Sequence, residues 1–288
     1  MNDQLLQVEG LNVSYPRRGF RAKPTEVLHG VDLQIDTGEV LGLVGESGSG
    51  KTTIGRAVLG LVKASGGSIR FRNEDITHAS PKRRRELARQ IQVIFQDPYS
   101  SLNPALSVGD ILSEPLIVQG ATARDARRKV VGLLDRVGLP NDAANRLPRE
   151  FSGGQRQRVA IARALAPEPE LIVCDEAVSA LDLSTQAVVL ELLQDIQRNT
   201  GVALLFISHD LAVVRHVSDR VAVIYKGSIV EEGPAGVVTS KPEHPYTRRL
   251  LFASPVADPV LQRERRASRR RLQEAGLLDT QRTVTGTV

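Results

Sequence analysis

The sequence predicts an α/β fold whose core is a largely parallel β-sheet covered by helices. Short apolar runs that are typical of buried strands alternate with amphipathic helical stretches along much of the chain. A glycine-rich loop joins one of these strands to the helix that follows it. A helix-rich stretch in the middle of the chain interrupts the alternation. We therefore expect one α/β core that carries a helical insert.

The composition favours a soluble cytosolic protein. The 288 residues suffice for one large domain or two small ones. Only one cysteine, Cys174, is present, which fits a reducing compartment. The first residues lack the basic and apolar regions of a secretory signal, and no apolar run approaches the ~20 residues that cross a bilayer. Such a chain is still free to dock on a membrane protein.

The positive charge is confined to one short stretch. Six arginines and one glutamate between positions 263 and 271 account for the whole net charge of +5. The rest of the chain is balanced, so no general nucleic-acid-binding face is indicated. We expect the arginine run to be a solvated tail, with attraction to anionic lipid or RNA as the weaker alternative.

The first part of the chain predicts strands and a phosphate-binding loop. Strands are expected at residues 5–15, 31–35, 68–71 and 91–95, with a polar loop at 16–26. Residues 45–52, Gly-Glu-Ser-Gly-Ser-Gly-Lys-Thr, fit the P-loop pattern. The apolar run 40–44 predicts a buried strand before this loop. One face of a helix after it is predicted from Ile54, Ala57, Val58 and Leu61.

The chemistry of phosphate binding explains the spacing of this motif. Glycines let the backbone approach phosphate oxygens, and the N–H groups at a helix start favour an anion. We expect Lys51 to reach the β- and γ-phosphates of a nucleotide and the Thr52 hydroxyl to ligate Mg²⁺. A plain Gly/Ser turn is the alternative, but it would not explain the flanking strand and helix.

From residue 97 to about 157 helix signals dominate. The apolar residues Val130, Leu133, Leu134 and Val137 define one helix face, and Gly138 stands where a helix-ending glycine is expected. Beyond this insert we expect helices at 155–166 and 184–199, strands at 171–174 and 202–207, and a short helix near Leu211. Strands 221–225 and 228–230 should form a hairpin. From about Thr239 the composition predicts an appendage with a mobile tail.

Two further stretches carry polar groups suited to nucleotide chemistry. Asp175 and Glu176 end an apolar strand, so the first can hold Mg²⁺ and the second can orient or deprotonate a water molecule. An acidic turn without function is the alternative. Ser152, Gly153 and Gly154 form a second glycine-containing turn at a helix start, which offers N–H groups and a hydroxyl to an anion.

These motifs, in this order, resemble the nucleotide-binding subunit of an ATP-binding cassette (ABC) transporter over residues 5–259. The resemblance implies a P-loop NTPase core of the RecA type with an antiparallel β edge. It also implies head-to-tail pairing, with each ATP held between one chain's P-loop and the other chain's Ser-Gly-Gly turn. The corresponding division is a core at 1–96 and 158–238, a helical signature subdomain at 97–157 and a C-terminal extension at 239–288.

The resemblance assigns the nucleotide contacts. Tyr15 resembles the aromatic residue that stacks on adenine, and residues 151–155 resemble the signature Leu-Ser-Gly-Gly-Gln with Phe151 in place of leucine. Residues 179–182 resemble the D-loop, which communicates across the dimer. The implied nucleotide-binding residues are Tyr15, Gly45, Glu46, Ser47, Gly48, Ser49, Gly50, Lys51, Thr52, Thr53, Ser152, Gly153, Gly154, Gln155 and Asp182.

The resemblance also assigns the catalytic and metal-binding residues. Gln96 resembles the Q-loop glutamine, which touches Mg²⁺ or the water and senses the membrane partner. Asp175 and Glu176 resemble the Walker B aspartate and the catalytic glutamate, and His209 resembles the switch histidine at the γ-phosphate. The implied catalytic set is Glu176, His209, Gln96 and Lys51, and the implied Mg²⁺ ligands are Thr52, Gln96 and Asp175.

Two stretches suggest a subfamily. Residues 96–104, Gln-Asp-Pro-Tyr-Ser-Ser-Leu-Asn-Pro, and 244–247, His-Pro-Tyr-Thr, resemble the ATPases of oligopeptide and dipeptide importers. Nickel, glutathione and some oligosaccharide importers share these features. Tyr99 makes the first stretch more similar to the second, F-type, ATPase subunit of such systems.

The resemblance implies cofactors and partners as well. ATP and Mg²⁺ are the expected cofactors of an ATPase that drives peptide uptake. The expected partners are a second ATPase subunit, either different or identical, two transmembrane permease subunits and, indirectly, an extracytoplasmic solute-binding protein. No nucleic acid is expected. The chain would lie at the cytoplasmic face of the inner membrane as a peripheral subunit.

Two other protein classes compete with this interpretation. A soluble ABC protein acting on ribosomes or DNA usually carries two cassettes or a long coiled-coil insert, and the sequence contains neither. A P-loop GTPase or small-molecule kinase is the other class. The guanine-reading pattern Asn-Lys-x-Asp is absent, and neither enzyme explains residues 151–155.

Overall fold

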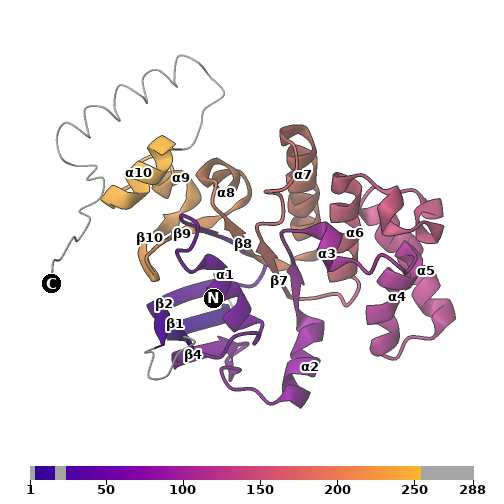
Figure 1. The fold of residues 1–288 in the computed structure, drawn as a ribbon, viewed down its shortest axis with the longest axis horizontal. Coiled ribbons are helices and arrows are strands. Elements are labelled where there is room, and N and C mark those ends of the chain that lie inside the picture. Colours follow the sequence, from indigo (N-terminus) through magenta and orange to yellow (C-terminus); the bar gives the residue numbers. More distant parts are fainter. Residues whose placement is uncertain (1–3, 17–23, 254–288) are drawn as a thin grey trace.

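The computed structural model describes residues 4–16 and 24–253, in which two β-sheets pack with a set of helices (Figure 1). The arginine run at 263–271 and the predicted tail lie outside the described residues. In Figure 1, helices α3–α6 gather at the right of the picture and α8–α10 at the upper left, and both groups contribute to one apolar core. The expected α/β core with a helix-rich stretch in mid-chain is confirmed.

The larger sheet has six strands in the order β10-β9-β3-β8-β7-β6. These strands are β3 (Val40–Val44), β6 (Ile91–Ile94), β7 (Leu171–Asp175), β8 (Ala203–Ser208), β9 (Arg220–Tyr225) and β10 (Ser228–Pro234). Every neighbouring pair is parallel except the β9–β10 hairpin. Because parallel strands end at one edge, the residues that follow β3, β7 and β8 come together there.

A second, antiparallel sheet has the order β2-β1-β4-β5. Its strands are β1 (Gln4–Tyr15), β2 (Thr25–Asp36), β4 (Gly66–Phe71) and β5 (Glu74–Asp75). β2 begins earlier than the expected strand at 31–35. The reason is a pairing irregularity near Gly30 (φ 62°), which puts both Leu28 and Val31 on the buried side and hides the alternation in the sequence.

The six-stranded sheet separates two apolar cores. On one face, Leu41 and Leu43 of β3 pack with α1 and the antiparallel sheet. On the other face, Val40 and Val44 pack with residues of the helix-rich stretch and of the helices that follow it. A strand that is buried on both faces has apolar residues at nearly every position. These strands could therefore be predicted from continuous apolar runs in the sequence.

The helices cover both faces of the larger sheet. They are α1 (Lys51–Val58), α2 (Pro81–Gln90), α3 (Pro98–Ser101), α4 (Val108–Val118), α5 (Ala123–Arg136), α6 (Gly153–Leu165), α7 (Leu183–Thr200), α8 (Leu211–Val217), α9 (Ala235–Val238) and α10 (Pro245–Ala253), with 3-10 turns η1 (Asn141–Asn145) and η2 (Pro148–Glu150). The expected buried face of α5 and the left-handed Gly138 (φ 63°) that follows this helix are confirmed.

One expected position on α1 is wrong. Ile54, Ala57 and Val58 are buried as expected, but Leu61 lies beyond the helix and is 62% exposed. Gly60 adopts a left-handed conformation (φ 73°), and the Leu61 N–H donates to the Arg56 carbonyl. These features end the helix about one turn before the predicted position, so the Leu61 side chain faces solvent.

Candidate functional site

The candidate site begins at the glycine-rich loop that follows β3. All five residues of β3 are buried, which fixes the start of the loop at the edge of the sheet. Gly50 is the N-cap residue of α1 in a left-handed conformation (φ 110°), and no side chain caps the helix. A Cβ on Gly50 would lie 2.6 Å from Leu28 Cδ2, and one on Gly45 would lie 2.3 Å from the Ile224 carbonyl oxygen. The loop thus offers uncapped N–H groups in a space that only glycine leaves open.

Lys51 places its ammonium group inside this loop. The residue is only 4% exposed, and Nζ donates hydrogen bonds to the carbonyl oxygens of Gly45 (2.8 Å) and Glu46 (2.9 Å). Burial lowers the pKa of Lys51, while nearby carboxylates, that of Glu176 foremost, act in the opposite direction. An ammonium group has three donors, so one remains for a phosphate oxygen.

Thr52 and Asp175 bring two oxygen atoms together beside the loop. The Thr52 hydroxyl donates to Asp175 Oδ1 at 2.9 Å. Burial raises the pKa of Asp175, and the hydrogen bond from Thr52 opposes this. Hydroxyl and carboxylate oxygens suit Mg²⁺, which takes one or two protein ligands together with phosphates and water. No group of three or more His, Cys, Asp or Glu side chains among residues 4–16 and 24–253 could hold a metal alone. The residues therefore fit Mg²⁺ as part of a nucleotide complex.

Glu176 and His209 meet because their strands, β7 and β8, are neighbours. His209 Nδ1 lies 3.4 Å from Glu176 Oε2. Glu176 has a left-handed backbone (φ 50°), which costs a non-glycine residue about 1–3 kcal/mol. Its N–H donates to the Ile207 carbonyl at 3.0 Å, which holds this conformation. Strain of this kind is concentrated at functional sites, so the pair is a candidate for the reacting centre.

The second glycine turn caps its own helix. The Ser152 hydroxyl accepts a hydrogen bond from the Gln155 N–H (3.3 Å), and Gln155 Oε1 accepts one from the Ser152 N–H (3.0 Å). Both residues are exposed, while Gly154 is buried. Between this turn and the P-loop, the described residues show no hydrogen bond or ion pair. The turn faces outwards and does not join the site of its own chain.

Asp182 lies beside this turn and begins α7. Its carboxylate accepts hydrogen bonds from the Thr185 N–H (3.0 Å), the Thr185 hydroxyl (2.7 Å) and the Ser184 hydroxyl (2.5 Å). The Ser184 bond, followed by those from Thr185, lowers the pKa of Asp182 well below its usual range. Gly154 approaches Thr185 so closely that a Cβ would lie 2.2 Å from its Cγ2 atom. The two motifs are therefore packed directly against each other.

Two of the sequence-predicted residues lie apart from this constellation. Gln96 is exposed and follows β6, the edge strand of the larger sheet. Tyr15 ends β1 and is partly buried against the core shared with the antiparallel sheet. No hydrogen bond among the described residues joins either side chain to the P-loop, Asp175 or Glu176. Their roles stay predictions.

The structure adds a residue to which the sequence assigned no role. Tyr246 of α10 is buried, and its hydroxyl accepts a hydrogen bond from the Glu46 N–H of the P-loop (2.8 Å). In the sequence, Tyr246 belongs to the His-Pro-Tyr-Thr stretch, which suggested only a subfamily. The residues around Tyr246 give no sign of a hydrogen-bond partner 200 positions away.

Comparison with known proteins places these motifs in one family. The family described as ABC transporter matches residues 28–179. Glutathione import ATP-binding proteins of Shigella boydii and Escherichia coli are 51% identical over 269 residues, which cover 92% of this chain. The chain spans only 43% of the length of these curated relatives. The names of these relatives do not describe an F-type subunit, so that designation is not retained.

Solved structures give the same result. CbiO1 from Clostridium perfringens, part of the ABC transporter complex cbiONQ, has a TM-score of 0.75 and 28% identity, covering 93% of this chain and 99% of its own. A bacterial ABC transporter cassette, solved as a dimer, has a TM-score of 0.71 and 27% identity, covering 80% of this chain and 99% of its own. The expected fold class, a P-loop NTPase core with an antiparallel edge, is confirmed.

Proposed function

Because the chain belongs to the ABC transporter family, we propose that it is the ATP-hydrolysing subunit of an importer. In this proposal, ATP binding and hydrolysis at a dimer interface drive the uptake of peptides through permease subunits. The observation that carries it is the meeting of two pairs beside the P-loop, Thr52 with Asp175 and Glu176 with His209. Positioning and charge stabilisation are what phosphoryl transfer requires of a protein.

The P-loop would bind and orient the triphosphate. Lys51 would turn its free N–H towards the β- and γ-phosphate oxygens, and the uncapped N–H groups of α1 would bind the same oxygens. Thr52 and Asp175 would hold Mg²⁺, with Gln96 as the predicted further ligand. The ion would supply positive charge against the charge that develops on the phosphates.

Glu176 and His209 would prepare the water for attack. The Glu176 carboxylate, only 19% exposed, would accept a hydrogen bond from the water and draw away its proton. His209 would hold that carboxylate in place and turn towards the γ-phosphate. Tyr15 would stack on the adenine ring. The strained backbone of Glu176 would fix the direction in which the carboxylate points.

A second ATPase subunit would complete each site. The turn of Ser152, Gly153, Gly154 and Gln155, in which Ser152 and Gln155 are exposed, is suited to another molecule's nucleotide, because it makes no hydrogen bond to the P-loop of its own chain. A related cassette was solved as a dimer in a post-hydrolysis state with ADP and phosphate, which supports pairing of this kind. The partner would be a different ATPase or a second copy.

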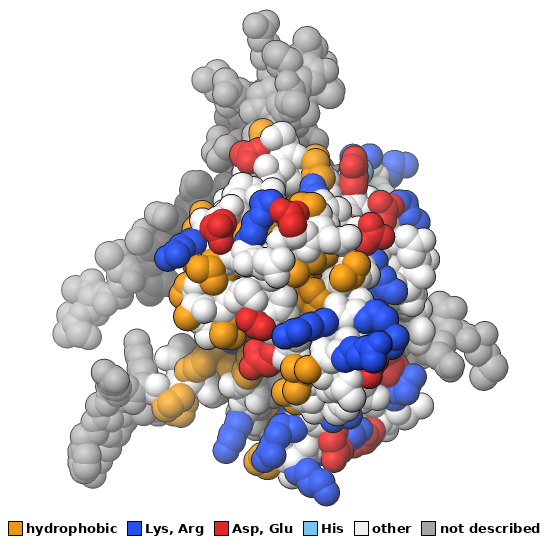
Figure 2. Space-filling model, turned by 90° about the vertical axis from the view of Figure 1, so that its right-hand side faces the viewer, with side chains coloured by type: hydrophobic (Ala, Val, Ile, Leu, Met, Phe, Trp, Pro, Cys, Tyr) orange, Lys and Arg blue, Asp and Glu red, His pale blue; other side chains and the backbone are white. Residues whose placement is uncertain are grey.

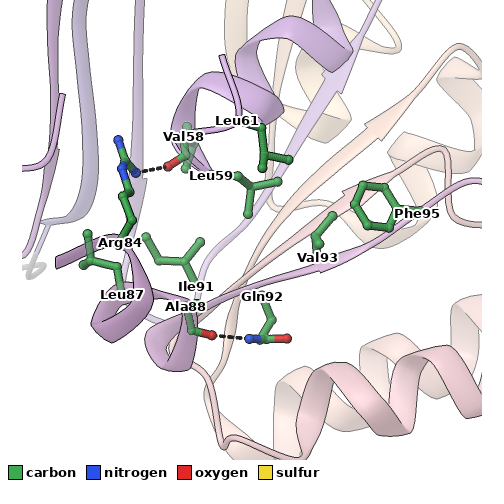
Figure 3. A pocket seen from close by; sticks show the side chains of 10 residues that line it. All are labelled: Val58, Leu59, Leu61, Arg84, Leu87, Ala88, Ile91, Gln92, Val93 and Phe95. Carbon is green, nitrogen blue, oxygen red and sulfur yellow. Dashed lines mark hydrogen bonds between the residues drawn. The ribbon is translucent and has the colours of Figure 1, made fainter. Parts of the chain in front are cut away.

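A groove beside β6 is the proposed contact with the permease. A cavity of about 240 Å³ is open between α1, α2 and β6, with Leu59, Leu61, Val93 and Phe95 around it (Figure 3). It adjoins a larger cavity of about 630 Å³ between α2 and α4, through the shared residues Ala88, Gln92 and Val93. The exposed apolar side chains of Leu61 and Phe95 at this groove support a contact with another protein. The position next to Gln96 would let a docked permease segment sense closure.

The surroundings of this groove also suit a protein partner. The face that carries α4–α6 shows hydrophobic side chains between groups of Lys and Arg (Figure 2). Val118 of α4 is 74% exposed, and Tyr99 is 63% exposed. The described residues contain no helix with the length and apolarity of a membrane span. The proposed place of the chain, by its family, is on permease subunits at the cytoplasmic face of the membrane.

The proposed cargo is a small peptide. The stretches 96–104 and 244–247 support the peptide-importer subfamily. The names of the relatives at 51% identity favour glutathione, itself a short peptide, as the second candidate. Nickel and oligosaccharides are the remaining alternatives that the subfamily allows. A solute-binding protein would deliver the cargo outside the membrane.

To test the proposal, the chain is reconstituted with the permease subunits and the solute-binding protein that are encoded on the same chromosome. Proteoliposomes are loaded with ATP and Mg²⁺, and the uptake of a labelled dipeptide and of labelled glutathione is measured. We expect ATP-dependent uptake of one of them, and none with Glu176→Gln. Co-purification with ribosomes in place of membrane subunits, or a preference for GTP, would contradict the proposal.

A further inference from the structure

Helix α10, the last helix of the described residues, makes a direct hydrogen bond to the P-loop. Tyr246, on the first turn of α10, is 5% exposed, and its hydroxyl accepts a hydrogen bond from the Glu46 N–H at 2.8 Å. Arg249, one turn further on, forms an ion pair with the Glu46 carboxylate at 3.3 Å. The second residue of the loop is therefore held through both its backbone and its side chain by a segment of the C-terminal extension.

The hydrogen bond acts on the peptide unit that also holds Lys51. The N–H of this unit belongs to Glu46 and donates to Tyr246, while its carbonyl belongs to Gly45 and accepts from Lys51 Nζ at 2.8 Å. A peptide unit is planar, so fixing the direction of its N–H also fixes the direction of its carbonyl. The Tyr246 hydroxyl and the Lys51 ammonium group therefore bind opposite sides of one planar peptide unit.

Tyr246 is itself fixed from three sides. Its ring packs against that of Tyr225 on β9, with centroids 4.2 Å apart. The start of α10 is tied to β10, because the Glu231 carboxylate accepts hydrogen bonds from the Glu243 and His244 N–H groups. His244 Nδ1 accepts a further bond from the Tyr246 N–H at 3.2 Å. Such support gives the hydroxyl a defined position.

We propose that Tyr246 is a positioning residue for nucleotide binding, because its hydroxyl orients the Gly45–Glu46 peptide and so the ammonium group of Lys51. The inference rests on the proposed function in one respect, that the P-loop binds ATP. Burial raises the pKa of Tyr246, so its hydroxyl keeps its proton at neutral pH. The C-terminal extension then influences the affinity for nucleotide without touching it.

The experiment separates the hydroxyl from the ring. Tyr246→Phe removes the hydrogen bond and keeps the ring packing. Tyr225→Phe is the matched control, because the Tyr225 ring is the one that packs against Tyr246, while the Tyr225 hydroxyl makes no hydrogen bond within the described residues. The full chain is titrated with a fluorescent ATP analogue and Mg²⁺. The KM and kcat of ATP hydrolysis and the melting temperature are measured for each variant.

We expect Tyr246→Phe to weaken ATP binding and to raise KM by about fivefold, the usual net worth of one hydrogen bond. The kcat should stay near that of the wild type, and the melting temperature should fall by no more than a few degrees, because only one part-buried hydrogen bond is lost. Tyr225→Phe should change none of these quantities.

Three results would overturn the inference. One is wild-type affinity in Tyr246→Phe, and another is an equal loss of affinity in Tyr225→Phe. The third is a fall in kcat and melting temperature without a change in KM, which would indicate packing alone. Failure of the wild type to bind ATP would instead refute the proposed function, so the two failures are distinguishable.

Discussion

Two helices of the chain, α1 and α6, begin at a glycine-containing turn. Their first N–H groups differ, because side chains cap those of α6 but not those of α1. At α1, the N-cap is Gly50 and no side chain caps the helix, while Lys51 is buried. At α6, Ser152 and Gln155 cap each other and remain exposed. The N–H groups of the first helix start have no side-chain cap, an arrangement that suits an anion. At the second helix start, the Ser152 and Gln155 side chains satisfy N–H groups of the turn. This surface is therefore stable in water before another molecule binds to it.

This difference has a functional consequence. A helix start that is complete within one chain can bind nucleotide in a monomer. A self-capped, exposed turn contributes only when a partner brings a phosphate to it, because a new acceptor must compete with the existing cap. We infer that binding belongs to the α1 start and dimer closure to the α6 start. Variants at the two helix starts should separate these two roles.

The largest effect is expected at the reacting centre beside α1. Glu176→Gln should lower the rate of ATP hydrolysis by about 10²- to 10⁴-fold, the usual range for a general base. ATP binding should persist, because the amide keeps the size of the carboxylate and Lys51 is untouched. Phosphate release measures the rate, and size-exclusion chromatography with ATP should show an accumulated dimer. Hydrolysis at the wild-type rate would remove Glu176 from this role.

The next effect concerns binding at the α1 start itself. Lys51→Ala should weaken ATP binding by about 10- to 100-fold, because hydrogen bonds to a charged group contribute about 1.5–3 kcal/mol. Titration with a fluorescent ATP analogue measures the affinity. Lys63→Ala, which changes an exposed lysine after α1, is the control and should bind normally. Unchanged affinity in Lys51→Ala would contradict the assignment of the loop.

A smaller effect is expected at the α6 start. Ser152→Ala should leave nucleotide binding to the monomer unchanged and weaken ATP-driven dimer formation. Loss of the cap should also cost about 1 kcal/mol of unfolding free energy. Ser107→Ala is the matched control, since Ser107 caps α4 in the same way with a bond from the Asp110 N–H. It should lose similar stability and still dimerise. Equal dimerisation of the two variants would show that Ser152 is only a cap.

The smallest effect is a pH dependence at α7, beside the α6 start. The pKa of Asp182 is lowered in the folded chain, so its stabilising contribution is present above the ordinary value of 3.8 and is lost as the pH falls below it. Asp182→Asn should therefore melt slightly below the wild type at neutral pH, and the difference should shrink in acid. Thermal unfolding at several pH values tests this. A difference that grows in acid would have the wrong sign.

The sequence by itself determined the local parts of this protein. The P-loop at 45–52, the acidic pair after 171–174 and the helix start at 152 are each encoded within a few neighbouring residues. Strands covered on both faces read as apolar runs, so the core strands could be located without coordinates. Their order also indicated the family, since spacing along a chain is a property of the sequence alone.

Only the tertiary structure decided which of these parts meet. Parallel pairing through β8 brings Thr52 to Asp175 across 123 positions, and the packing of α10 brings Tyr246 to Glu46 across 200. The exposure of Leu61 depended on the early end of α1 at Gly60, which helical periodicity cannot show. The reason is physical: local pattern fixes backbone conformation and burial, while long-range contacts arise only when distant segments share one core.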